Sequence, residues 1–175
     1  MRMDLMVNRT AEMSAIIHVT LGLSANFPHL NAGNTLVLMV SPDYSATVAM
    51  HIAHELSYAG EMADILPIDV PYPDEDVAPY IEKAKLAMLN HFRFSDVKYS
   101  NYLLVEAGVI RGGNYIWLTN LLKDMVVGDI VTAAMFENVN SKFKSDVVAN
   151  YYDDDEQDLT FYYEKPNKHW DGNKQ

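Results

Sequence analysis

A carboxylate followed by a glycine-containing turn is the part of this sequence best suited to chemistry. The apolar run that begins at Tyr102 ends in Glu106, and Gly112 and Gly113 precede a stretch with helical periodicity. Glycine lets a backbone approach a ligand closely, and free N–H groups at the start of a helix bind anions, usually phosphates. The segment therefore predicts an anion site beside a carboxylate at the carboxyl end of a strand, where open α/β sheets bind ligands. A tight turn without a ligand is the alternative, because glycine pairs are common in turns.

Two other groups of polar residues are predicted to be solvated surface. His51, His54 and Glu55 lie opposite the apolar side of an expected helix and lack the spacing of a zinc-protease motif. The run from Asp153 to Glu156 lacks the alternating spacing of a calcium-binding loop, so a solvated loop is favoured over a metal site or a contact with a basic partner. We therefore predict no metal site formed by the protein alone. Hydrolase and thiolate chemistry have no support, because the sequence has no serine-hydrolase motif and no cysteine.

The elements that must position these residues alternate between strand and helix. Continuous apolar runs such as TLVLMV at 35–40 are typical of strands buried on both faces, and their alternation with helices predicts a mostly parallel sheet. A first helix is expected with Asn8 or Thr10 as its N-cap. Its predicted buried stripe consists of Met13, Ile16, Ile17, Thr20 and Leu21. Strands are predicted at 35–40, 63–70, 102–106, 129–136 and 159–163, and later helices at 45–58, 79–92 and 114–125.

Length and composition are those of a globular domain. The 175 residues are 49% hydrophobic and 21% charged, and they contain neither a transmembrane run nor a secretory signal. We expect a single domain over 1–175, with an N-terminal helical segment at 1–30 and a mobile tail at 168–175. The lack of cysteine fits a cytoplasmic protein.

The charge of the chain limits the partners that it could have. The formal net charge is −11, and no cluster of Lys and Arg is present to displace counterions from nucleic-acid phosphates. Neither a nucleic acid nor a membrane is therefore predicted as a partner. The acidity instead fits solubility or attraction of a basic protein partner.

The segment YLLVEAGVIRGGN at 102–114 resembles the phosphoribosyl-pyrophosphate loop of the type I phosphoribosyltransferases. In that family an apolar strand leads to one or two acids and then to a hydroxyl-rich turn with a glycine pair. The resemblance implies that Glu106 binds the ribose hydroxyls. It also implies that the turn formed by Arg111, Gly112, Gly113 and Asn114 holds the 5′-phosphate.

The turn departs from the family pattern at several positions. Ala107 stands where the second acid often is, and Asn114 replaces the final Thr or Ser. Ile110 and Arg111 replace small or hydroxyl residues. Arg111 could contact a phosphate through both ends of its guanidinium group, or its bulk could block the pocket.

The resemblance extends from Thr35 to Glu164. The stretch at 35–56 is similar to the family's first strand, pyrophosphate loop and following helix, which implies that Asp43, Tyr44 and Ser45 face the pyrophosphate. Ser45 is also a candidate N-cap, and this role is favoured, although both can hold together. The C-terminal region resembles purine-type members, especially the xanthine type. There Asn138 takes the place of a base-reading Lys, and an aromatic strand stacks on the base or simply packs at a sheet edge. The residues implied in base binding are Asn138, Phe161, Tyr162 and Tyr163.

The resemblance implies a single doubly wound α/β domain with five strands, helices on both faces and a small C-terminal hood. It leaves two main functions open. The favoured one is a divergent, non-catalytic or regulatory protein that keeps a pocket for a nucleotide or phosphoribosyl ligand. The alternative is an active purine-type phosphoribosyltransferase, in which Glu106 acts at the reacting ribose and Mg²⁺ neutralises the pyrophosphate. A third is an acidic inhibitor or nucleic-acid mimic that binds another protein, and a homodimer is also expected to be accessible to this fold.

Overall fold

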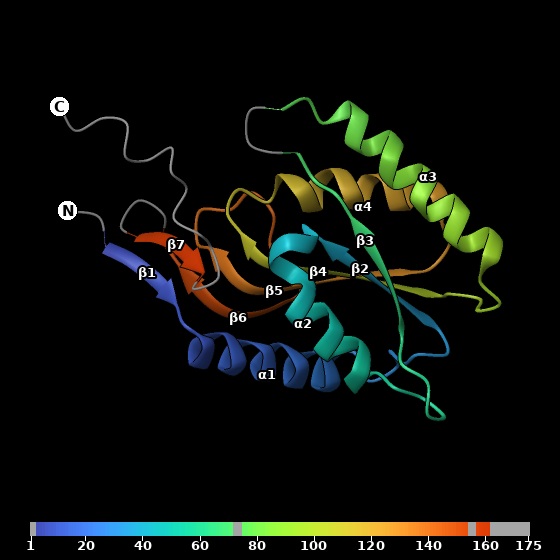
Figure 1. The fold of residues 1–175 in the computed structure, drawn as a ribbon, viewed down its shortest axis with the longest axis horizontal. Helices are drawn as coiled ribbons and strands as arrows, with labels where there is room; N and C mark the ends of the chain where they lie inside the picture. The colour runs from blue at the N-terminus through green and yellow to red at the C-terminus, as the bar shows by residue number, and fades with distance from the viewer. Residues whose placement is uncertain (1–2, 72–74, 154–156, 162–175) are drawn as a thin grey trace.

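Strands and helices alternate along the chain as far as residue 138, and two further strands then follow without an intervening helix (Figure 1). The structure is a computed structural model that describes residues 3–71, 75–153 and 157–161. Its helices are α1 (Arg9–Asn26), α2 (Pro42–Glu55), α3 (Ala78–Phe94) and α4 (Gly113–Met125). Its strands are β1 (Met3–Val7), β2 (Thr35–Val40), β3 (Asp64–Ile68), β4 (Asn101–Val109), β5 (Asp129–Asn138), β6 (Val147–Tyr152) and β7 (Gln157–Phe161). None of the described helices has the length and apolar character needed to cross a bilayer.

Five parallel strands form the central sheet in the order β3-β2-β4-β5-β6. After β2 the chain adds β3 on one side and then crosses to place β4 on the other side. The strand order therefore reverses between β2 and β4, which is the position where open α/β sheets bind ligands beyond the carboxyl ends of their strands. The predicted fold class, a doubly wound and mostly parallel α/β sheet, is confirmed.

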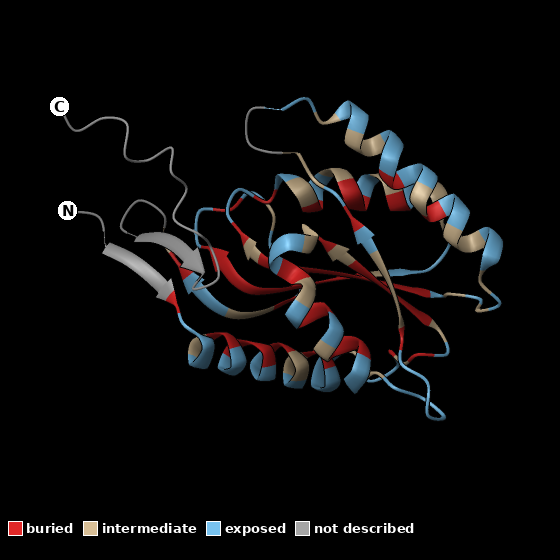
Figure 2. Ribbon diagram, in the orientation of Figure 1, coloured by how far each residue is buried: buried red, intermediate tan, exposed pale blue. Residues whose placement is uncertain are grey.

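Helices cover both faces of this sheet (Figure 2). Alternate residues of β4 explain how two cores arise from one strand, because successive side chains point to opposite faces. Leu103 and Val105 pack in the core under α1 and α2, whereas Leu104 packs in the core under α3 and α4. The uninterrupted apolar runs of β2 and β4 therefore follow from burial on both sides.

The edge strands differ from the prediction. The fifth strand of the sheet is β6, which pairs with β5 through Ala133 and Val147, whereas the predicted strand at 159–163 contributes to β7. β7 pairs in parallel with β1 in a separate two-stranded sheet. The strand β6, with the sequence VVANYY, was not predicted; its middle positions are partly exposed, as an edge strand allows. The internal Pro67 of β3 is tolerated because β3 forms the other edge of the sheet, where a residue without an N–H need not interrupt the hydrogen bonds between strands.

The first helix buries a different face from the predicted one. Asn8 is the N-cap, as expected, and its side chain accepts a hydrogen bond from the N–H of Ala11 at 2.9 Å. However, Met13, Ile17 and Leu21 of the predicted stripe are 40%, 49% and 62% exposed. The residues that the helix buries are Glu12, Ala15, Ile16, Val19 and Leu23.

Close packing explains which face of α1 is buried. A methyl group on Gly22 would lie 2.7 Å from Cγ1 of Val147 in β6, so the helix approaches the sheet on its small-residue side. Ala15 lies on the buried side as well and is fully buried. Apolar periodicity alone could not distinguish the two sides, because large apolar residues occur on both.

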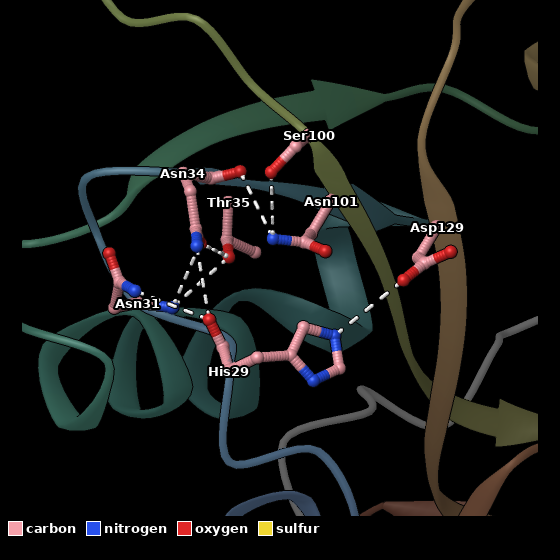
Figure 3. A network of polar contacts seen from close by, with 7 residues as sticks. All are labelled: His29, Asn31, Asn34, Thr35, Ser100, Asn101 and Asp129. Carbon is pink, nitrogen blue, oxygen red and sulfur yellow. Dashed lines mark hydrogen bonds and ion pairs between the residues drawn. The ribbon is translucent and has the colours of Figure 1, made fainter.

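Side-chain hydrogen bonds tie together the amino ends of the strands (Figure 3). The Asn34 Oδ1 atom accepts from the hydroxyl of Thr35 at 2.7 Å, and Asn101 Nδ2 donates to the Asn34 carbonyl at 3.4 Å. The Nε2 atom of His29 lies 3.8 Å from Oδ2 of Asp129 at the start of β5. The bond from Asn101 links the starts of β2 and β4 at the edge opposite the carboxyl ends, and the His29 contact joins the loop before β2 to the start of β5.

Candidate functional site

A pocket of about 1010 Å³ lies beyond the carboxyl ends of β2, β3 and β4. It is lined by Ser41 after β2, by Asp69 after β3 and by Glu106 within β4. The turn before α4 and the first residues of α2 complete this side of the pocket. The pocket therefore occupies the position at which the strand order reverses.

Glu106 supplies a buried carboxyl group to the pocket. The residue is 6% exposed, and Oε1 of Glu106 accepts a 2.9 Å hydrogen bond from Nδ2 of Asn114. Burial raises the pKa of Glu106 from 4.5 to about 7, and the hydrogen bond from Asn114 partly opposes this shift because it stabilises the ionised form. The carboxyl group is therefore more readily protonated than that of an exposed glutamate, and in its ionised form it accepts hydrogen bonds from a ligand.

The two glycines of the turn have different structural demands. Gly112 is the N-cap of α4 with φ of 74°, and a methyl group there would lie 2.5 Å from Cβ of Phe143. Gly113 begins the helix and lines the pocket, and a methyl group there would meet no described heavy atom within 4 Å. The fold thus requires glycine at position 112, whereas at 113 the absence of a side chain leaves the helix start open to the pocket.

The start of α2 faces the same pocket. Asp43 and Tyr44 line it, as does Ser41, a non-glycine residue with φ of 54°. The helix begins at Pro42, so the prediction that Ser45 is its N-cap was wrong, and Ser41 holds that position. The starts of α2 and α4 therefore lie around one pocket. At α2, however, Pro42 has no N–H, and the N–H groups of Tyr44 and Ser45 donate to the carbonyl of Ser41.

Ser45 lies behind the pocket wall rather than in it. Its side chain is fully buried, and its hydroxyl oxygen accepts a 3.0 Å hydrogen bond from the N–H of Ala107. This bond joins α2 to the end of β4, next to Glu106. Ser45 therefore holds the two walls of the pocket together, a role that its sequence position did not reveal.

Charged side chains of both signs surround the pocket. Arg111 is exposed and lies on the turn before α4, and Lys83 reaches the pocket from α3. The described lining also carries four carboxylates, those of Asp43, Asp69, Glu75 and Glu106. Acidic side chains thus outnumber basic ones around the pocket, so these side chains alone do not favour a phosphate ligand.

Several lining residues were not anticipated from the sequence. Asp69 directly follows the apolar strand β3, just as Glu106 ends an apolar run, so the same signal could have identified it. Tyr80 and Lys83 on α3 and Trp117 on α4 form a further wall. Their positions depend on how α3 packs against the sheet, which no local pattern revealed.

Of the residues predicted to read a base, Asn138 is not among those that line the pocket. Asn138 is 1% exposed, and its Oδ1 atom accepts a 2.8 Å hydrogen bond from the N–H of Asn140 in the turn that follows β5. Phe161 ends β7, whereas Tyr162 and Tyr163 lie outside the described residues, as do Asp154 to Glu156 and the tail at 168–175. Of the remaining polar groups, His54 and Glu55 are exposed and His51 is half-buried, in agreement with a solvated face.

The C-terminal segment that resembles purine-type enzymes is built into the fold through its polar residues. Asp146 Oδ2 accepts hydrogen bonds from the backbone and the hydroxyl of Thr132, both at 2.8 Å. Ser141 and Phe143 pack against Gly112. This segment therefore supports the glycine turn from behind.

Comparison with known proteins supports the fold through structure alone. No protein-family model and no curated protein matches the sequence. The structure is similar to that of a purine phosphoribosyltransferase from Pyrococcus horikoshii, with a TM-score of 0.64 and 11% identity over 93% of this chain and 94% of that one. It is also similar to a xanthine-guanine-hypoxanthine phosphoribosyltransferase from Helicobacter pylori, with a TM-score of 0.61 and 12% identity over 95% and 98% of the chains. A hypoxanthine-guanine phosphoribosyltransferase from Bacillus anthracis gives a TM-score of 0.55 at 12% identity over 82% and 80%. The chain therefore has the fold of the type I phosphoribosyltransferases, as its sequence motifs predicted.

Proposed function

We propose that this protein binds a phosphorylated ribose ligand, either a nucleotide or phosphoribosyl pyrophosphate, in the pocket at the carboxyl ends of β2 and β4. The observation that carries the proposal is that Glu106 and the open start of α4 at Gly113 face one pocket. A carboxylate accepts hydrogen bonds from a vicinal diol, and the N–H groups of a helix start bind a phosphate. Ribose 5-phosphate carries both groups.

The glycine at position 113 supports a ligand more strongly than the pattern alone. A structural explanation accounts for Gly112, whose φ and neighbours exclude a side chain. No such constraint acts on Gly113, where a methyl group has space. Close approach of a ligand to the backbone is a reason for glycine at such a position.

The donor groups around the pocket also fit Mg²⁺ brought in with a polyphosphate. Four carboxylates would repel a bare pyrophosphate, and Asp43, Asp69 and Glu75 can each offer oxygen to a hard cation. The described residues contain no group of three or more carboxylate or imidazole side chains placed to hold a metal by themselves. The ion would thus be shared between ligand phosphates and one or two carboxylates, as is usual for Mg²⁺, where it supplies charge neutralisation.

An active transferase is the second candidate, and the two helix starts favour it. Both lie around one pocket, which suits a ligand with phosphate groups at two positions. The start of α4 is the stronger anion position, because at α2 Pro42 has no N–H and the N–H groups of Tyr44 and Ser45 donate to Ser41. The engagement of Asn138 in a turn removes support for base reading at that residue. We therefore place ligand binding first and base transfer second.

Calorimetric titration tests the binding proposal directly. The ligands are phosphoribosyl pyrophosphate with Mg²⁺, ribose 5-phosphate, GMP and inorganic phosphate, against the native protein, Glu106→Gln and the control Glu61→Gln, whose residue is exposed. We expect ribose-containing ligands to bind the native protein and the control but to bind Glu106→Gln at least about tenfold more weakly, because a hydrogen bond to a charged group is lost. If no ligand bound at millimolar concentration, the proposal would be wrong.

A turnover assay separates the two candidates. Phosphoribosyl pyrophosphate and Mg²⁺ are incubated with hypoxanthine, guanine or xanthine, and the released pyrophosphate is measured. Release that depends on the base and disappears in Glu106→Gln would establish the transferase. Binding without release would establish the non-catalytic function.

A further inference from the structure

The side chain of Asn114 does not face the position expected for a phosphate, although its place in the turn implies this. The residue follows Gly113 in the first turn of α4, where a side chain could face a bound phosphate. Its amide nitrogen instead donates to Oε1 of Glu106 at 2.9 Å. One residue therefore connects the helix start to the buried carboxylate.

Both partners of this hydrogen bond are held in place by the fold. The amide of Asn114 is held by a helix whose start is fixed by Gly112 against Ser141 and Phe143. Glu106 is held by the central strand β4, between β2 and β5. Both ends of the hydrogen bond are therefore on rigid elements, so the bond can fix the carboxylate orientation rather than follow it.

Resting on the proposed function, we propose that Asn114 is a positioning residue that orients the Glu106 carboxylate toward the ribose hydroxyls and makes diol recognition and phosphate recognition depend on one another. The amide donates a hydrogen bond to one carboxylate oxygen, while the backbone of the same residue lies at the anion-binding start of α4. A ligand with both a phosphate and a 2-hydroxyl group benefits from this arrangement. A ligand with only one of them does not.

The ionisation of Glu106 gives the proposal a measurable signature. The hydrogen bond from Asn114 lowers the pKa of Glu106, against the larger effect of burial, which raises it to about 7. Loss of the amide therefore moves the pKa of Glu106 further upward, and the carboxyl group becomes more protonated at neutral pH. A protonated carboxyl group accepts hydrogen bonds from a diol less well than a carboxylate does.

Other titratable groups also surround Glu106, and the experiment must separate them from it. Tyr115 on α4 interacts with Glu106 itself. The titratable groups that line the pocket are Asp43 and Tyr44 on α2, Asp69 and Glu75 between β3 and α3, Tyr80 and Lys83 on α3, and Arg111 before α4. A ligand phosphate titrates near pH 6 as well. Ribose 5-phosphate and 2-deoxyribose 5-phosphate differ by one hydroxyl group. The difference between their affinities therefore cancels the contributions that these other groups make to the binding of both.

The test combines a titration of the free protein with ligand binding. The variants are Asn114→Ala, Asn114→Asp and the control Asn120→Ala, which changes an exposed asparagine of the same helix. The Glu106 carboxyl group is titrated by ¹³C NMR in each protein without ligand. Affinities for ribose 5-phosphate, 2-deoxyribose 5-phosphate and inorganic phosphate are then measured by calorimetry between about pH 5.5 and 8.5, the range over which a group of pKa near 7 titrates.

We expect the NMR midpoint of Glu106 to rise in Asn114→Ala, to rise further in Asn114→Asp, where a second carboxylate repels it, and to stay unchanged in Asn120→Ala. At neutral pH, Asn114→Ala is expected to bind ribose 5-phosphate about tenfold more weakly, with partial recovery at higher pH. Its affinity for the 2-deoxy sugar and for phosphate should change much less.

Two results would overturn this role of Asn114. One is an unchanged midpoint and unchanged ribose 5-phosphate affinity in Asn114→Ala. The other is an equal loss of affinity for all three ligands at every pH, which would assign Asn114 to the phosphate alone. If the native protein bound none of the ligands, the proposed function itself would fail, whereas native binding with unaffected Asn114 variants would overturn the positioning role only.

Discussion

The hydroxyl oxygen of Ser45 accepts a hydrogen bond of 3.0 Å from the backbone N–H of Ala107, across a sequence separation of 62 residues. This bond ties the first turn of α2 to the end of β4 immediately after Glu106. Both groups are buried, so water cannot replace either partner. The start of α2 is thereby held to β4, the strand that carries the carboxyl group of the pocket.

Removal of this hydroxyl group should destabilise the fold. Ser45→Ala leaves the N–H of Ala107 buried without its partner, and we expect the free energy of unfolding to fall by about 1–3 kcal/mol. Urea unfolding followed by circular dichroism measures this, with Ser24→Ala on the exposed side of α1 as the control. Equal stabilities of the two variants would show that the bond contributes nothing.

The two glycines of the turn should respond differently to alanine. Gly112→Ala must adopt φ of 74° and meets Phe143 at 2.5 Å, so we expect a loss of about 2 kcal/mol or more in the free energy of unfolding. Gly113→Ala should fold with native stability but lose affinity for a phosphorylated ribose, because its methyl group points into open space at the pocket. Unfolding and calorimetric titration of both variants measure the contrast. Unimpaired ligand binding by Gly113→Ala would argue against close approach of a ligand there.

Burial of Glu106 predicts a pH-dependent cost to stability. Its pKa rises from 4.5 to about 7 on folding, so between these values the folded state binds more protons than the unfolded state. The contribution of Glu106 to the free energy of unfolding therefore falls as pH rises from about 4.5 to 7 and is constant above that, with a total change on the order of 3 kcal/mol. Glu106→Gln, which does not titrate, should gain stability relative to the native protein over this range.

Urea unfolding of both proteins at several pH values measures this difference. We expect the stability of Glu106→Gln relative to the native protein to increase through the acidic range and to level off above neutral pH. A difference that did not vary with pH would show that the carboxyl group is not desolvated.

Two neighbouring residues of α1 test which face of the helix is buried. Ile16 is fully buried, whereas Ile17 is 49% exposed. We expect Ile16→Ala to lower the free energy of unfolding by about 2–5 kcal/mol and Ile17→Ala by less than about 1 kcal/mol. The same unfolding experiment measures both variants, and similar losses would contradict the orientation of the helix.

Much of the fold follows from patterns that short segments carry by themselves. The runs TLVLMV and YLLVE are apolar apart from Thr35 at the start of the first and Glu106 at the end of the second, which is expected when both faces of a strand are covered. Boundaries were less accurate, since α2 begins at Pro42 rather than Ser45 and β4 continues to Val109. The αL residue Ser41 allows the earlier helix start, and no sequence pattern indicates a strained serine.

The sequence alone determined a doubly wound α/β fold and a glycine-containing turn after the strand that carries Glu106, because apolar runs, helical periodicity and glycine pairs act over a few residues. Tertiary structure alone decided that α1 buries the side of Ala15 and Gly22, that Ser45 supports Ala107, and that Asn114 turns toward Glu106. Each of these contacts joins two different secondary-structure elements. Their geometry depends on how closely two packed elements approach, which is a property of the assembled core and not of any local segment.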